Sequence, residues 1–162
     1  MSPVAPSLLA RLADVARFLV IGSHSVALQR PDMQPRPPSD TDLFVPVDAL
    51  EALVAMLLAD GFDVTSWEEP VAPPLRFEEL RGRWYLRARR GAETIDLTYE
   101  CPWLDFEDRW SRRVERGGVP LGDLDAVATL IAARNRPGDA ERAAELRRVA
   151  RGAELRRSGA VA

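Results

Sequence analysis

The segment DTDLFV, at positions 40–45, places two carboxylates at alternate positions of a run that reads as a β-strand. Side chains two residues apart on a strand point to the same face, so Asp40 and Asp42 share one face with Phe44. Two like charges on one face repel each other unless a cation lies between them. This strand is therefore either solvated on its acidic face or built to hold a positive partner there.

A second strand pattern, TIDLTY at positions 94–99, carries a third acid. Alternation puts Asp96 on one face with Thr94 and Thr98, and puts the apolar residues on the other face. An aspartate among strong strand formers is unfavourable for a sheet, which indicates a purpose. A third carboxylate from a neighbouring strand would complete a metal site of the two-ion kind. The alternative is that all three are solvated acids on the exposed face of an antiparallel sheet.

A glycine turn precedes these acids in the chain. The apolar run RFLVIG, at positions 17–22, reads as a buried strand that ends at Gly22, and positions 23–29 read as a short helix. Free backbone N–H groups at such a turn bind anions, so Gly22 and Ser23 are candidates for binding a triphosphate. Ser23 can donate its hydroxyl to a phosphate or cap the helix. Arg36, in the loop before the acids, is a third nucleotide-binding candidate or a solvated loop arginine; Arg134 and Arg136 have similar standing.

The remaining pattern predicts an α+β fold, in which helices flank a mixed sheet and a helical C-terminal segment follows. Positions 30–39 hold four prolines and read as a loop, as do positions 68–74. Asp48 and Glu51 have the spacing of a capping box. The further predicted elements are a helix starting near Ser7, a helix over 48–60, a strand over 62–66, a hairpin of 83–89 with 94–99, and helices over 104–116, 121–135 and 139–157. We expect one domain over 1–162, with an α/β core over 1–100 and a helical part over 101–162.

Composition narrows the functional classes. The net charge of −3 argues against a general polyanion-binding protein, and all 22 basic residues are arginine, which rules out any catalytic lysine. The single cysteine, Cys101, cannot form an internal disulfide and fits a reducing cytoplasm. The N-terminal segment lacks the features of a signal peptide, and no apolar stretch is long enough to span a membrane. We therefore expect a cytoplasmic protein without a membrane partner.

The ordered segments FLVIGS, RPPSDTDLFV and TIDLTY resemble the pattern of the nucleotidyltransferase superfamily, which has a polymerase-beta-like fold. The chain is most similar to its minimal bacterial members, including proteins related to abortive-infection nucleotidyltransferase toxins, and NRPGDAERAAELR at 135–147 resembles a stretch of theirs. The resemblance implies an enzyme that transfers a nucleoside monophosphate from an NTP to a hydroxyl. It implies that Asp40, Asp42 and Asp96 bind Mg²⁺. The acceptor stays open among RNA ends, a protein hydroxyl and a small molecule.

A second hypothesis comes from a different functional class. The chain can be a catalytically silent nucleotidyltransferase-fold protein that acts through a partner, as in the antitoxin-like half of a toxin-antitoxin system. The absence of lysine favours this hypothesis, and the intact acid trio opposes it. A partner protein or a homodimer is compatible with either hypothesis. His24 is the only histidine, and it is a polar residue near the start of the helix, a phosphate contact or a proton acceptor.

Overall fold

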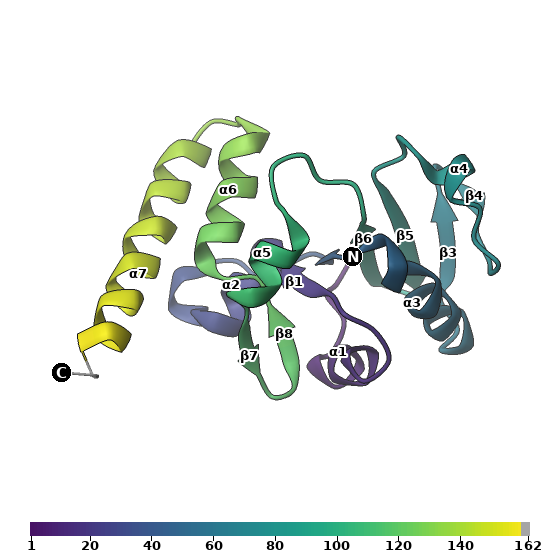
Figure 1. The fold of residues 1–162 in the computed structure, drawn as a ribbon, viewed down its shortest axis with the longest axis horizontal. Coiled ribbons are helices and arrows are strands. Elements are labelled where there is room, and N and C mark those ends of the chain that lie inside the picture. The colour runs from purple at the N-terminus through teal and green to yellow at the C-terminus, as the bar shows by residue number, and fades with distance from the viewer. Residues whose placement is uncertain (160–162) are drawn as a thin grey trace.

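The protein is described by a computed structural model that covers residues 1–159, in which helices flank an eight-stranded mixed sheet (Figure 1). The strand order across the sheet is β4-β3-β5-β6-β2-β1-β8-β7. This arrangement confirms the predicted α+β class. The strands are β1 (Leu19–Ile21), β2 (Thr41–Phe44), β3 (Asp63–Ser66), β4 (Glu69–Pro70), β5 (Tyr85–Arg90), β6 (Glu93–Thr98), β7 (Val114–Arg116) and β8 (Val119–Leu121).

The helices fall into two groups that cover opposite faces. They are α1 (Pro6–Ala13), α2 (Gly22–Gln29), α3 (Val47–Ala59), α4 (Phe77–Leu80), α5 (Phe106–Ser111), α6 (Leu124–Arg134) and α7 (Asp139–Gly159), with a 3₁₀ turn at Pro31–Met33. In Figure 1, α6 and α7 lie side by side at one end of the molecule, and α3 lies towards the other. None of the described helices is long and apolar enough to cross a lipid bilayer.

The main core lies between the sheet and the helices α1 and α3. Leu50, Leu53 and Leu57 recur on one side of α3 and are fully buried against the inward-facing residues of the strands, among them Leu43 and Leu97. Burying a leucine side chain stabilises the fold by about 1.5–3 kcal/mol. Because Leu43 and Leu97 face this core, their strand neighbours Asp42 and Asp96 must point to the opposite face.

Two smaller clusters hold the second group of helices on that opposite face. Ile21 and Phe44 pack against Phe106 of α5 and Ala126 of α6. A third cluster, which includes Leu146, joins α2, α6 and α7. The helices that follow residue 105 are thereby fixed over the β1–β2 half of the sheet, beside the acidic strand face.

The region after residue 100 differs from the helical part that the sequence pattern predicted. The expected helix over 104–116 ends at Ser111, and the chain then forms the hairpin of β7 and β8, with β8 parallel to β1. Gly117 and Gly118 make the turn with φ of 55° and 77°, a region that glycine enters without steric cost. The two glycines were interpreted as a break between helices, and they are the turn of a hairpin. The next helix starts at Leu124 instead of Leu121.

Predicted local details also change. No side chain caps α1 or α3, whose N-cap residues are Ala5 and Pro46, so Ser7 and Asp48 are not caps. Glu51 instead accepts a hydrogen bond from the backbone N–H of Leu75, at 2.7 Å. The second proline-rich loop contains the short strand β4, and the first contains the 3₁₀ turn. These differences arise because contacts distant in sequence override local preferences.

Candidate functional site

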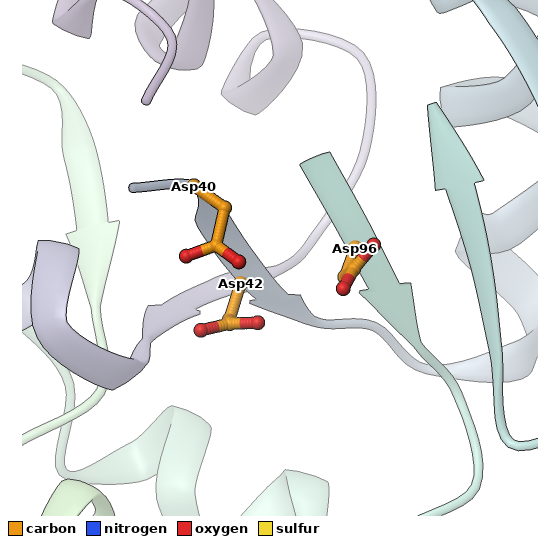
Figure 2. A group of neighbouring side chains, drawn as sticks. All are labelled: Asp40, Asp42 and Asp96. Carbon is orange, nitrogen blue, oxygen red and sulfur yellow. The ribbon is translucent and has the colours of Figure 1, made fainter. Parts of the chain in front are cut away.

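Two parallel strands bring the three predicted acids together. β2 pairs with β6 in a register that places Asp42 opposite Asp96, and Asp40 lies just before β2. Figure 2 shows the three side chains on one side of these two strands. One carboxylate oxygen from each lies within 4.8 Å of the others, and all three residues are partly buried. The alternation of each strand and the register between strands both contribute to this convergence.

The glycine turn lies directly against Asp42. Gly22 follows Ile21, which pairs with Asp42 across β1 and β2, and Gly22 adopts φ of 68°. A Cβ atom at this position would overlap Oδ2 of Asp42. Only glycine therefore satisfies both the left-handed backbone and the close approach of the carboxylate. The first N–H groups of α2 start at this turn, where helical N–H groups have no intrahelical partner.

Burial and the neighbouring acids favour the protonated form of Asp42. Burial, together with the charges of Asp40 and Asp96, raises the pKa of Asp42 to about 7, and the charges of Arg134 and Arg87 oppose the shift. The uncharged form of a carboxylate is favoured when it loses water and approaches other carboxylates. Asp42 thus lies in an environment where a bound cation would be strongly favourable.

Arg87 was not among the predicted site residues, and it binds Asp96. Its Nε and Nη2 atoms donate to the two carboxylate oxygens of Asp96, each at 2.7 Å, from the directly paired position on β5. The bidentate pair holds the Asp96 side chain in one orientation. The pattern RWYLRARR places Arg87 on a strand face, but its pairing with Asp96 depends on the hairpin register, which the sequence alone did not define.

A basic cavity of about 520 Å³ opens on the side of Asp40 and Asp42 nearest α2. Ser23 lines it together with three arginines, Arg134, Arg136 and Arg142. Asp139 holds Arg134 through an Nη2–Oδ1 contact of 2.7 Å, so this guanidinium is fixed beside the acids. The sequence pattern did not indicate Arg142 as a site residue, because its position at the basic cavity depends on the packing of α7 against α6.

Two other predicted residues lie elsewhere. Arg36 is exposed in the loop, and the arginines that line the basic cavity come from α6, α7 and the turn between them. His24 is buried, and its Nδ1 lies 2.9 Å from Oγ1 of Thr41, which also accepts the backbone N–H of Val4. Burial lowers the pKa of His24. His24 therefore joins α2 to β2 by this contact.

The donor set fits a divalent cation of the hard type. Mg²⁺ prefers oxygen ligands, usually takes only a few carboxylates from the protein and completes its shell with water and substrate phosphates. Three converging carboxylates beside a basic cavity meet that description, and the burial of Asp42 beside two like charges favours a cation there. These residues can hold a divalent metal ion.

Comparisons with known proteins agree with this architecture. The solution structure of the antibiotic-resistance factor ANT(2'')-Ia, a nucleotidyltransferase, aligns with 96% of this chain and 91% of its own length, at a TM-score of 0.53 and 21% identity. The crystal structure of the Megavirus polyadenylate synthase aligns with 86% of this chain and 30% of its own, at a TM-score of 0.51 and 13% identity. No protein-family model and no curated protein matches the chain.

At these identities the similarity concerns the fold, and it agrees with the superfamily that the three acids and the glycine turn indicated. The narrower likeness to abortive-infection proteins stays a prediction. Both structural neighbours lead to one conclusion: the chain shares the fold of ANT(2'')-Ia, a nucleotidyltransferase, and of the Megavirus polyadenylate synthase.

Proposed function

We propose that the protein is a metal-dependent nucleotidyltransferase, which transfers a nucleoside monophosphate from an NTP to a hydroxyl group. The observation that carries the proposal is the contact between two complementary half-sites. Three carboxylates suited to a divalent cation converge, and the cavity that Asp40 and Asp42 line is also lined by three arginines. A metal–triphosphate complex needs both kinds of charge in one site.

The side chains have distinct roles in this proposal. Gly22 and Ser23 present N–H groups to the phosphates at the start of α2. Arg136 and Arg142 neutralise the phosphates that leave as pyrophosphate. Asp96, held in place by Arg87, accepts the proton of the attacking hydroxyl. A divalent ion bound by the three acids would polarise the α-phosphate and offset its charge in the transition state.

Nucleotide binding gives the first test. Calorimetry with Mg²⁺ and a non-hydrolysable analogue of each of the four NTPs should show binding for at least one. Arg136→Gln and Arg142→Gln should each weaken it about tenfold or more, since each removes a charged hydrogen bond worth roughly 1.5–3 kcal/mol. Arg76→Gln is the matched control, because Arg76 is exposed and pairs with Glu79 far from the cavity. Equal effects from all three variants would indicate only long-range charge.

Turnover gives the second test. The wild type, supplied with Mg²⁺ and labelled NTPs, should release pyrophosphate or label an acceptor, and Asp40→Asn should reduce that rate by orders of magnitude without loss of the fold. Binding without turnover, across RNA, protein and small-molecule acceptors, would favour the silent partner protein. One observation supports that second candidate: Arg87 occupies both oxygens of Asp96. If this pairing is what silences the site, Arg87→Gln should free Asp96 and give turnover that the wild type lacks, with nucleotide binding unchanged.

A further inference from the structure

A second cavity, of about 310 Å³, lies beside Asp42 and differs from the basic one in chemistry. Its walls are mostly apolar, and they come from α6 and from the ends of β5 and β6. Gly22, Asp42, Ile131 and Arg134 line both cavities. The two cavities therefore adjoin at Asp42.

Trp84 lines this second cavity in a conformation that is rare for a bulky residue, with φ of 68°. The surrounding chain imposes the conformation. The backbone N–H of Trp84 donates to the Glu100 carboxylate at 3.3 Å, and its carbonyl accepts the N–H groups of Tyr99 and Glu100 at 3.0 and 3.2 Å. Backbone strain that is held by several contacts is concentrated at ligand and active sites.

The strained backbone presents an aromatic pair. The indole of Trp84 stacks on Trp103, with ring centroids 6.2 Å apart and planes 25° from parallel. Both rings line the cavity, yet they stay 47% and 53% exposed. Two stacked and exposed indoles form an apolar wall that a flat ligand can cover.

Charge excludes a polyanion from the same place. Among the residues that the structure describes, Arg134 is the only basic one that lines the cavity, and Asp139 already holds it. The acids at the cavity are Asp42 and Glu100. A nucleic-acid strand requires basic side chains along its phosphates, and here it would meet carboxylates.

Resting on the proposed function, we infer that this aromatic cavity is the acceptor subsite, and that the acceptor is a small hydroxyl compound with a flat apolar face, uncharged or cationic. Nucleotidyl transfer needs the attacking oxygen opposite the leaving pyrophosphate. Pyrophosphate fits the basic cavity, so attack comes from the other one. Asp96 adjoins that side, because Thr98, two residues further on the same face of β6, lines the aromatic cavity.

The step balances as an ordinary displacement. The acceptor hydroxyl oxygen forms a bond to the α-phosphorus of the NTP, and the bond from that phosphorus to the α–β bridging oxygen breaks. Pyrophosphate departs with the bond electrons, and the hydroxyl proton passes to Asp96 and then to water. The product is a phosphodiester of the acceptor and the nucleoside.

The test measures binding of two probes, tyramine and 2-phenylethanol, by calorimetry or ligand-observed NMR in the presence of Mg²⁺ and a non-hydrolysable NTP. Both should bind the wild type, and Trp103→Ala and Trp84→Ala should each weaken binding about fivefold or more, as expected for loss of an aromatic partner. Trp67→Ala is the control, since Trp67 is exposed and lies outside this cavity. Trp103→Ala removes a ring without changing the strained backbone at Trp84, so the test remains decisive if Trp84→Ala fails to fold.

Several outcomes would overturn the inference. The first is a lack of binding by either probe at millimolar concentration. The second is a larger loss of NTP affinity than of probe affinity in Trp103→Ala, which would make the cavity a nucleobase site. The third is displacement of the probe by oligoadenylate. Labelling of a hydroxyl in the protein itself, in preference to tyramine, would equally contradict a small-molecule acceptor. If the proposed function itself is wrong, the probes should still bind and the tryptophan variants should still weaken their binding, but no NTP should bind. The aromatic cavity then has no role as an acceptor subsite.

Discussion

At the scale of single residues, Asp42 links protonation to stability. Its pKa in the folded protein is about 7, above that of an unfolded aspartate, so the native state holds a proton over the interval between the two values. The resulting stabilisation is fully present below about pH 4 and is lost as the pH rises through 7. The metal-free protein should therefore lose stability between pH 5 and pH 8 through this residue.

Asp42→Asn tests this linkage, because asparagine keeps the size and removes the charge. In the presence of a chelator, the melting temperature of the variant should change less between pH 5 and pH 8, and at pH 8 it should exceed that of the wild type. Mg²⁺ should stabilise the wild type more than the variant, since metal binding adds to stability by mass action. A destabilised variant with an unchanged response to Mg²⁺ would mean that Asp42 has a purely structural role.

Gly22 is the second residue whose identity follows from its surroundings. Gly22→Ala places a methyl group in a left-handed backbone conformation and against Oδ2 of Asp42. The left-handed backbone alone costs roughly 1–2 kcal/mol, and the overlap adds to it and displaces the carboxylate. Gly61→Ala is the matched control, because Gly61 has φ of 83° but open space around it. Chemical denaturation should show a larger loss for Gly22→Ala, and only that variant should weaken Mg²⁺ binding.

At the scale of elements, a side-chain cap defines where α6 begins. Asp123 caps this helix by accepting the N–H of Ala126 at 2.8 Å, whereas Asp48 in the first turn of α3 caps nothing. Asp123→Ala should destabilise the protein by about 1 kcal/mol, and Asp48→Ala by less than about 0.5 kcal/mol. For a chain of this size the former corresponds to a fall of about 3 °C in melting temperature. Equal shifts for both variants would contradict the assignment of the cap.

At the scale of the whole molecule, α7 couples core packing to the site. Leu146 is fully buried between α7, α6 and α2, and Arg142, one turn earlier, lines the basic cavity. Leu146→Ala should cost roughly 2–5 kcal/mol through the cavity it leaves. It should also loosen α7 and weaken NTP binding. Leu57 is buried to the same degree on α3, in the main core. Leu57→Ala should therefore destabilise the protein by a comparable amount, while NTP affinity stays unchanged. Calorimetry on the folded variants separates the two.

Much of this protein was predictable from short-range patterns. Alternation in DTDLFV and TIDLTY determines which faces carry Asp42 and Asp96, because a strand has a period of two residues regardless of its neighbours. The glycine at position 22 similarly marked the turn from β1 to α2. Local propensity and turn chemistry depend on residues that are adjacent in the chain, and these features can therefore be inferred before any fold is known.

The tertiary structure decided the rest. The register between β2 and β6, which are more than fifty residues apart in sequence, determines that the acids converge, and the β5 register brings Arg87 onto Asp96. Packing of α7 against α6 brings Arg142 to the basic cavity, and pairing with β1 makes β8 a strand in a region that read as helical. Each of these depends on contacts between segments distant in sequence, whose free energy exceeds the small local preferences from which a sequence is interpreted.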